Sequence, residues 1–266
     1  MSGFSRVYFF PKSVALLLLA LLLTATSPAQ TSSARLIPFR QGTKWGYVDQ
    51  HRRLVLPLLY DEAGPFVREL AWVRIGPLYG YIDGGGNPVT PVQFTKASTF
   101  VRNRATVELN GETFQIDGSG KRLTTPPEPE PETEFLTQGD LLRQNGKVGF
   151  RFTVGQAVVP SIYDEIVENY NGLLFVRQGA KWGVLNNKGK LILPLEYDAI
   201  RAVEANNFVL PVVEQQGKLG YLAEDGTLLV APKYAAAEPF VADVARVTTP
   251  DGRTGYIDTR GREYFD

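Results

Sequence analysis

Short apolar runs and polar turns alternate along the chain from about residue 35 to the C-terminus. The stretch 44–63 shows the pattern: an aromatic and β-branched run (KWGYV), a polar turn, an apolar run that ends in proline (RLVLP), and a Tyr-Asp pair. Such runs are typical of short β-strands that are joined by tight turns. Segments with helical periodicity of useful length are missing, so the pattern predicts an all-β protein.

The same phrase recurs at a nearly constant spacing. Residues 44–63 and 181–200 share Lys-Trp-Gly, the turn, the proline and Tyr-Asp at identical offsets. If the Gly of this phrase is taken as the origin, successive origins are separated by 34, 34, 35, 34, 37 and 35 residues. The origins are Gly46, Gly80, Phe114, Gly149, Gly183, Gly220 and Gly255. We therefore expect seven repeats, which bury their hydrophobic faces against their neighbours.

Each repeat reads as strand, tight turn, strand, longer loop and a third strand. The sequence thus predicts about seven antiparallel β repeats of about 34 residues, stacked as a curved solenoid-like or propeller-like array. Three strands fall short of a four-stranded propeller blade, which favours an open or curved array. The chain opens with an extra strand at 35–41 (RLIPFRQ) and ends after the second strand of the last repeat. Its two ends could complement one another and close a ring, or they could equally reflect where the repeat begins.

The origin glycines lie inside predicted strands, where glycine costs stability unless another group needs the space. Large side chains stand beside them in several repeats. We expect an aromatic ring from the neighbouring repeat to pack over each of these glycines: Gly46, Gly183, Gly220 and Gly255.

The third repeat departs from the others, because Phe114 replaces its Gly and a Pro/Glu-rich segment replaces its Tyr-Asp loop. Alternating Pro and Glu favours extended, solvated chain, so we expect 124–134 to be an extended segment at the rim of the array. A cation-binding acidic finger is the alternative for its glutamates, Glu128, Glu130, Glu132 and Glu134.

The N-terminus predicts export. Arg6 and Lys12 precede the apolar run Val14–Leu23, whose 10 residues are too few to span a bilayer and suit a signal peptide. We place cleavage after Ala29, with an uncut anchor as the alternative, and expect a secreted or periplasmic protein. The expected organisation is a signal peptide (1–29), repeats 1–3 (30–123), the Pro/Glu-rich segment (124–134) and repeats 4–7 (135–266).

The charge and cysteine content exclude several classes of function. Removal of residues 1–29 leaves 28 − 2 = 26 cationic and 28 acidic residues, a formal charge of −2. This balance offers neither the basic footprint of a nucleic-acid-binding protein nor a polybasic membrane patch. The chain has no Cys, so disulfides and thiolate metal sites are excluded, and the fold must rely on its hydrophobic core.

The Lys-Trp-Gly phrases at 44–46 and 181–183, the Gly-Tyr-Ile-Asp starts and the Tyr-Asp phrases together resemble a WG-repeat (KWG-repeat) protein. The resemblance covers about Arg35 to the C-terminus. It departs from the family pattern in the third repeat, and Trp stands in the motif in only two repeats. The resemblance implies an exported bacterial repeat protein with no assigned chemistry, so it carries no catalytic residue to this chain.

Acidic residues recur at two places in the repeat. At the strand end before the turn, we expect Asp to accept backbone N–H bonds and cap the turn; these residues are Asp49, Asp83, Asp117 and Asp258. After the repeated tyrosine, the acidic residues are Asp61, Asp164 and Asp198. Two of these could form a glycosidase pair, but residues that repeat with the fold are separated by the spacing of the repeats, which is too large for one site.

Three further features bear on possible chemistry. His51 is the only His, and no nucleophile–base set that includes it can be named. The Gly-rich stretch 83–87 lacks the Lys and the helix of a phosphate loop and predicts a hairpin turn. Exposed tryptophans could stack on sugars, but two of the three occupy the repeat position, which favours core packing of Trp45, Trp72 and Trp182.

The sequence therefore predicts no catalytic, cofactor-binding or metal-binding residue. The favoured interpretation is an exported, non-enzymatic binding or scaffold protein whose partner is a protein or glycan of the cell envelope, with no integral membrane segment after signal removal. The alternative is a secreted or periplasmic glycan hydrolase that uses loop carboxylates. An enzyme would need residues outside the repeat pattern to converge, and the sequence shows no such cluster.

Overall fold

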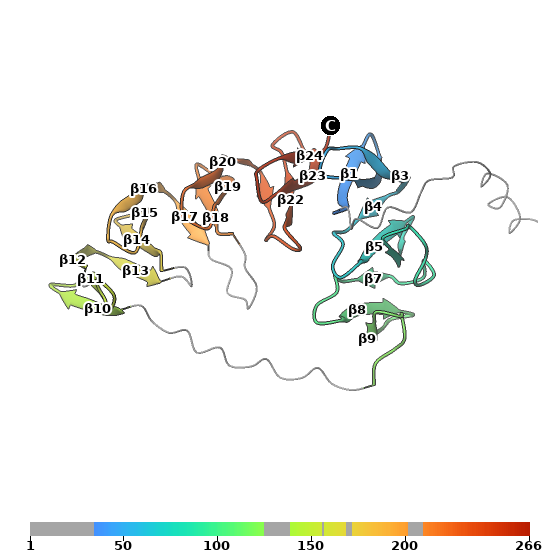
Figure 1. Cartoon of the computed structure of the whole chain (residues 1–266), viewed down its shortest axis with the longest axis horizontal. Helices are drawn as coiled ribbons and strands as arrows, with labels where there is room; N and C mark the ends of the chain where they lie inside the picture. The colour runs from blue at the N-terminus through green and yellow to red at the C-terminus, as the bar shows by residue number, and fades with distance from the viewer. Residues whose placement is uncertain (1–34, 125–138, 156, 169–171, 202–209) are drawn as a thin grey trace, which may run out of the picture. The chain divides into compact units, whose positions relative to one another are not determined.

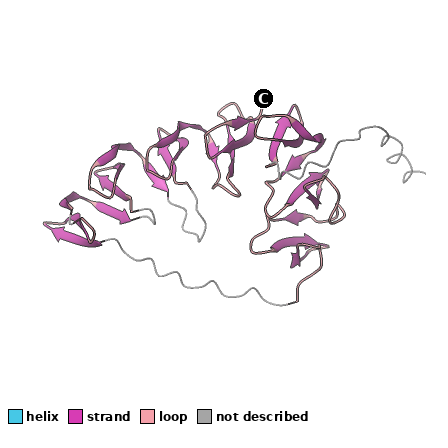
Figure 2. Ribbon diagram, in the orientation of Figure 1, coloured by secondary structure: helices cyan, strands magenta, loops and turns pink. Residues whose placement is uncertain are grey.

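The computed structural model describes residues 35–124, 139–155, 157–168, 172–201 and 210–266. These residues form strands, turns and loops, and none of them is helical (Figure 2). The strands are grouped into seven separate antiparallel sheets (Figure 1). The all-β class and the number of repeats are thus confirmed, whereas the predicted signal peptide and nearly all of segment 124–134 lie outside the described residues.

The first three sheets each contain three named strands. They are β1 (Ile37–Gln41), β2 (Lys44–Val48) and β3 (Leu54–Tyr60); β4 (Glu62–Ala63), β5 (Leu70–Ile75) and β6 (Leu78–Asp83); and β7 (Lys96–Ala97), β8 (Arg104–Leu109) and β9 (Glu112–Asp117).

The fourth sheet has three strands and the last three sheets have four. They are β10 (Gly139–Gln144), β11 (Lys147–Phe152) and β12 (Val158–Tyr163); β13 (Glu165–Glu168), β14 (Leu174–Gln178), β15 (Lys181–Leu185) and β16 (Leu191–Tyr197); β17 (Ala199–Arg201), β18 (Val212–Gln215), β19 (Lys218–Leu222) and β20 (Leu228–Tyr234); and β21 (Ala236–Ala237), β22 (Val244–Thr248), β23 (Thr254–Asp258) and β24 (Glu263–Tyr264).

A complete repeat therefore has four strands and not the three that the sequence predicted. The additional strand follows Tyr-Asp and is only two to four residues long, too short to show a hydrophobic alternation. It belongs to the next sheet: β16 ends at Tyr197 and β17 begins at Ala199, so Asp198 alone joins two sheets. The argument for an open array depended on three strands per repeat, and four strands per repeat remove it.

The origin glycines face a bulge in the strand that contains the repeated proline. Trp182 pairs with Tyr197 and Val184 with Leu193, so the single residue between them on β15, Gly183, lies opposite three residues of β16. The first, fourth and sixth sheets have the same bulge. Proline suits a bulge because it has no N–H for the ladder.

The bulge explains why these positions are glycine. A Cβ at Gly183 would lie 2.7 Å from the carbonyl oxygen of Leu193, and a Cβ at Gly46 would lie 2.5 Å from that of Leu56. Gly220 likewise faces the backbone of its own sheet. The expected ring of a neighbouring repeat is therefore wrong at these positions. At Gly255 the nearest atoms do belong to a ring, but it is Phe265 of the same repeat.

The aromatic contact between repeats is made by the residue after the glycine. The buried Tyr47 ring packs edge-on against Phe66 of the next repeat, with ring centroids 4.8 Å apart. Its hydroxyl donates a hydrogen bond to the carbonyl oxygen of Gly64, at 3.0 Å. Each contact of this kind buries a large ring and satisfies its polar end. The same pairing recurs between Tyr81 and Phe100 and between Tyr221 and Phe240. The tyrosine hydroxyls donate to the carbonyl oxygens of Ser98 and Glu238, respectively.

The first and last sheets contact one another, and we call this contact the seam. Tyr256 packs edge-on against Trp45, with centroids 5.8 Å apart, and its hydroxyl donates to the carbonyl oxygen of Ala63 at 3.1 Å. A parallel bridge joins Arg40 to Phe265. Strand β24 accordingly lies beside β1 (Figure 1). The prediction that the ends of the repeat region could complement one another is confirmed at the level of these contacts.

Candidate binding surface

The repeated Lys and Asp form a clamp between neighbouring sheets. Lys181 Nζ lies 2.6 Å from Asp198 Oδ1, and Asp198 Oδ2 accepts the backbone N–H of Gln216 at 2.7 Å. Each carboxylate thus connects the Lys of its own repeat to the first hairpin of the next. The same clamp is formed by Lys44, Asp61 and Gly76, and by Lys147, Asp164 and Gly179.

Both members of the clamp stand out in the sequence, but their pairing was not predicted. The signal was present, because each of the three repeats that contain the Tyr-Asp aspartate also begins with Lys. In the third repeat both are replaced, and Glu112 at the Lys position pairs instead with Arg122. The sixth repeat keeps the Lys, as Lys218, but has Ala235 in place of the aspartate, so the clamp cannot form there.

The clamp also bears on the hydrolase hypothesis. Hydrogen bonds from the Lys side chain, followed by those from the backbone amide, lower the pKa of Asp61, Asp164 and Asp198. A glycosidase general acid needs the opposite, a raised pKa that keeps the carboxyl protonated. These residues belong to separate sheets and hold the repeats together.

The clamp predicts a pH-dependent contribution to stability. The pKa of Asp198 is lower in the folded than in the unfolded protein, so its contribution is complete above the unfolded value and is lost as pH falls below about 4. We expect Asp198→Asn to lower the melting midpoint at pH 7 and to have a smaller effect at pH 3. Thermal unfolding of both proteins at the two pH values measures this difference. A difference that does not change with pH would contradict the clamp.

The aspartates at the strand ends cap the tight turns. Asp83 Oδ1 accepts the backbone N–H groups of Gly85 and Asn87, at 2.9 and 2.8 Å. Asp49, Asp117 and Asp258 make the equivalent pairs of bonds. The predicted turn-capping role is confirmed, and the Gly-rich stretch 83–87 is such a turn.

The tryptophans pack to different degrees. Trp45 is buried in the core, as predicted, whereas Trp72 and Trp182 are half-buried. Trp72 packs edge-on against Tyr79, and its Nε1 donates to Thr99 Oγ1 at 3.3 Å.

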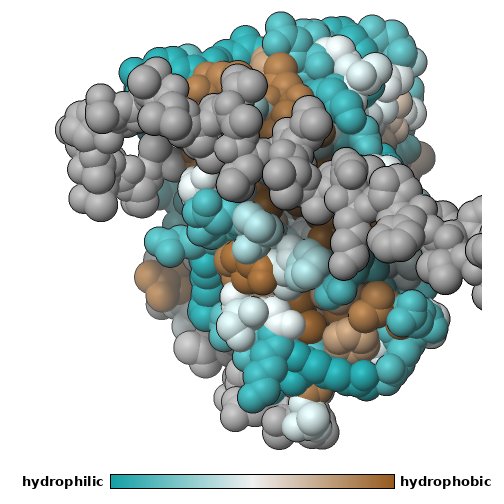
Figure 3. Space-filling view, turned by 90° about the vertical axis from the view of Figure 1, so that its right-hand side faces the viewer, coloured by the Kyte–Doolittle hydropathy of each residue, from teal (hydrophilic) through white to brown (hydrophobic). Residues whose placement is uncertain are grey.

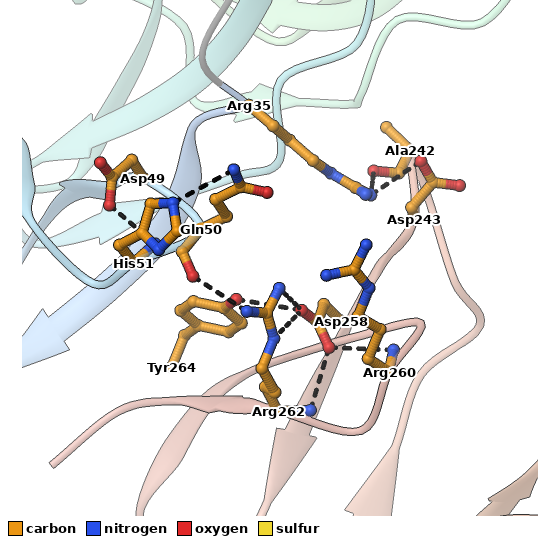
Figure 4. A network of polar contacts seen from close by, with 10 residues as sticks. All are labelled: Arg35, Asp49, Gln50, His51, Ala242, Asp243, Asp258, Arg260, Arg262 and Tyr264. Carbon is orange, nitrogen blue, oxygen red and sulfur yellow. Dashed lines mark hydrogen bonds and ion pairs between the residues drawn. The ribbon is translucent and has the colours of Figure 1, made fainter.

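Residues outside the repeat pattern gather at the seam, where two tight turns meet. The turns are 49–53, between β2 and β3, and 258–262, between β23 and β24. Arg262 Nη1 donates to the carbonyl oxygen of Gln50 at 3.1 Å and so connects the two turns (Figure 4). His51, the only His, lies exposed in the first turn, and its Nε2 is 3.3 Å from Gln50 Nε2.

Asp258 is the buried anchor of this surface. Its side chain is 3% exposed, and it accepts Arg262 Nε at 2.8 Å and the hydroxyl of Tyr264 at 3.0 Å. Although burial opposes it, hydrogen bonds from Arg262 and from the backbone of Arg260 lower the pKa of Asp258, so the group is ionised. Asp258 thus holds the side chain of Arg262 and the backbone of Arg260.

Three arginines from the two ends of the described chain surround the same space, and we call Arg35, Arg260 and Arg262 the arginine triplet (Figure 4). Arg35 enters from the segment before β1 and binds Asp243 Oδ2 at 2.8 Å and the carbonyl oxygen of Ala242 at 2.6 Å. Burial, joined by the nearby charges of Arg260 and Arg262, lowers the pKa of Arg35. No sequence signal pointed to this cluster, because its members become neighbours only through the seam.

The family was identified by comparison with known proteins. The sequence model described as "WG containing repeat" matches residues 45–76, 79–112, 153–182 and 182–214. The chain is a WG-repeat protein. This confirms the resemblance drawn from the Lys-Trp-Gly and Tyr-Asp phrases. A comparison with curated proteins gave no match.

Solved structures resemble the WG-repeat protein only loosely. A protein of unknown function from Bacteroides caccae is 12% identical with a TM-score of 0.32, and the match covers 86% of this chain and 90% of the other. Hsv2 from "Kluyvelomyces marxianus" is 11% identical with a TM-score of 0.31, over 81% and 86%. The extracellular domain of BT4673 from B. thetaiotaomicron is 11% identical with a TM-score of 0.25, over 85% and 41%. Likenesses at this level carry no argument about function.

Elsewhere on the seam of the WG-repeat protein lies a pocket of about 250 Å³, whose lining includes Arg40, Arg253 and the C-terminal Asp266. Arg253 Nε binds Asp251 Oδ2 at 2.8 Å, and its Nη1 donates to the carbonyl oxygen of Asp266 at 2.9 Å. Arg40 Nε donates to the carbonyl oxygen of Gly42 at 3.0 Å. Both arginines of this pocket therefore donate hydrogen bonds to oxygen atoms of the chain itself.

Two classes of site are not found in the part of the chain that the structure describes. No three His, Cys, Asp or Glu side chains there are grouped as a metal site would require. Within the same ranges, no helix has the length and hydrophobicity needed to span a membrane.

Proposed function

We propose that the WG-repeat protein is an exported, non-enzymatic binding or scaffold protein that presents its repeated β surface to a protein or glycan of the cell envelope. Export rests on the sequence of residues 1–29. The non-enzymatic role is supported by the acidic residues of the repeats, which act as clamps and turn caps.

Exposed leucines at the same position in three repeats carry the proposal of a binding surface, and we call these three residues the leucine row. The strands that contain the repeated proline lie at an edge of their sheets, and three of them begin with an exposed leucine. The residues are Leu54, Leu191 and Leu228, with 55%, 42% and 40% of their surface exposed. Exposed apolar side chains on edge strands favour contact with another molecule. Figure 3 shows that hydrophobic residues surface in separate patches among hydrophilic ones on the side it presents.

Capture from the native envelope tests this function. The purified protein is immobilised and exposed to envelope proteins and to envelope glycans in separate experiments. We expect a retained partner that is lost when Leu54, Leu191 and Leu228 are all replaced by Ser. Val101→Ser, at another exposed apolar position, is the matched control. Retention of the partner by the triple variant would reject the leucine row as the surface, and release of shortened glycans would favour the hydrolase.

Export has its own test. N-terminal sequencing of the protein from its native host is expected to begin at Gln30, with residues 1–29 removed. A full-length product in the cytosol would reject export without bearing on the leucine row.

A further inference from the structure

The seam carries a second site, distinct from the leucine row. We propose that the arginine triplet binds a tetrahedral oxyanion, a phosphate or sulfate group that is either free or part of an ester. Guanidinium groups present several N–H donors in a planar fork that matches the oxygens of such groups. Three of them around one space can bind different oxygens of a tetrahedral anion.

The triplet is partly preorganised. Arg262 is fixed by the buried Asp258 on one side and by the carbonyl oxygen of Gln50 on the other. Arg260 is held at its backbone, whose N–H donates to Asp258 Oδ1 at 3.0 Å. The turn between them contains Gly261 with a φ of 74°, a conformation that glycine adopts without strain. A ligand would therefore meet two arginines on a rigid turn, which reduces the entropy lost on binding.

The triplet also carries positive charge that the neighbouring aspartates do not neutralise. The guanidinium of Arg260 has no hydrogen-bond or ion-pair partner among the described residues, and Figure 4 draws it beside Asp258 and below Arg35. Asp258 is committed to Arg262 and Tyr264. The partner of Arg35, Asp243, has 68% of its side chain exposed, and an exposed pair of this kind contributes little and exchanges easily. Three arginines against two aspartates leave a formal charge of 3 − 2 = +1 at this position.

The other cationic part of the seam has no counterpart of Arg260. In the pocket that contains Arg40 and Arg253, each guanidinium group donates to a chain oxygen, and the two arginines face two aspartates, Asp251 and Asp266, so that no formal positive charge is left over. Nor does the chain as a whole attract polyanions, since its formal net charge is zero. The inferred ligand is therefore a compact anionic group and not a nucleic acid.

Calorimetric titration of the purified protein tests the proposal. Inorganic phosphate and inorganic sulfate are added at constant ionic strength, with chloride as the reference anion. We expect saturable binding of phosphate or sulfate, and an affinity about ten-fold lower in Arg260→Gln, the loss that one charge-assisted hydrogen bond accounts for. Arg35→Gln is expected to weaken binding in the same way. Arg143→Gln, which removes an exposed arginine of the fourth repeat, is the matched control and should bind as the unaltered protein does.

Two further arms identify the source of the group. Glucose 6-phosphate represents a sugar ester, and vesicles of phosphatidic acid, compared with phosphatidylcholine, represent a lipid headgroup. Arg260→Gln should melt as the unaltered protein does, because its guanidinium holds no structural partner among the described residues, so a lost signal cannot be ascribed to unfolding. Heats indistinguishable from chloride in every arm, or equal affinity of Arg260→Gln and the unaltered protein, would overturn the proposal. Neither result would affect capture of an envelope partner by the leucine row.

Discussion

Gly183→Val is expected to lower the free energy of unfolding by about 3 kcal/mol, at the upper end of the usual penalty for overpacking. A side chain at this position would start 2.7 Å from the carbonyl oxygen of Leu193, and the obstacle is backbone, which cannot rotate away as a side chain can. Relief would require the bulge of β16 to move and its pairing with β15 to weaken. Chemical denaturation of the variant measures the loss.

Gly84→Ala provides the control for this experiment. Gly84 lies in the tight turn after β6, and an added Cβ there would meet no atom within 4 Å. We expect its stability to change by no more than about 0.5 kcal/mol. If both variants unfold with the midpoint of the unaltered protein, the close approach of the bulge to Gly183 does not determine the choice of residue.

Removal of the last two residues is the second change with a large expected effect. Phe265 is buried and covers Gly255, and its carbonyl oxygen accepts Arg52 Nη2 across the seam at 3.1 Å. The loss of a buried Phe side chain costs about 3 kcal/mol or more. A chain that ends at Tyr264 is therefore expected to unfold at a clearly lower denaturant concentration.

A chain that lacks only Asp266 separates the two contributions. Asp266 accepts two exposed hydrogen bonds, from the backbone N–H of Gly42 at 3.2 Å and from Arg253 Nη1 at 2.9 Å. Their loss should cost much less than the loss of the ring. Restoring Phe265 should therefore restore most of the stability. Equal stability of the full chain and the chain ending at Tyr264 would show that Phe265 and Asp266 contribute nothing to the stability of the fold.

The spacing of a few residues was enough to predict the architecture. Gly, Pro and Tyr-Asp recur because each has a role in the backbone. The glycine leaves room for the bulge, the proline suits the bulge, and the aspartate connects its own repeat to the first hairpin of the next. Such roles depend on local geometry, and local geometry repeats with the sequence. The number of sheets and the capping of the turns followed from the same signals.

The partners of these residues could not be predicted in the same way. The glycine was assigned to a neighbouring ring because the sequence shows which residue needs space but not which atoms fill it. The short strands after Tyr-Asp were missed, because two to four residues carry no periodicity. In the core, the contact between Tyr47 and Phe66 crosses from one sheet to the next and therefore has no local signature in the sequence.

The arginine triplet shows the same limit more sharply. Arg35 and Arg260 stand 225 positions apart in the sequence, and neither belongs to a repeated motif. Only the pairing of the first sheet with the last brings them together. Nothing in the composition indicates the site either, because the formal charge of the whole chain is zero.

The C-terminal Asp266 has a mechanical consequence. Its bond to Gly42 places a carboxylate on the first hairpin of the first repeat, as Asp61 does on the hairpin of the second through Gly76. A force that pulls the two ends of the repeat region apart is therefore borne first by the seam, through this bond and the bridge between Arg40 and Phe265. The individual sheets are loaded only after the seam has opened, so a chain held at both ends would yield by one discrete extension before any repeat unravels.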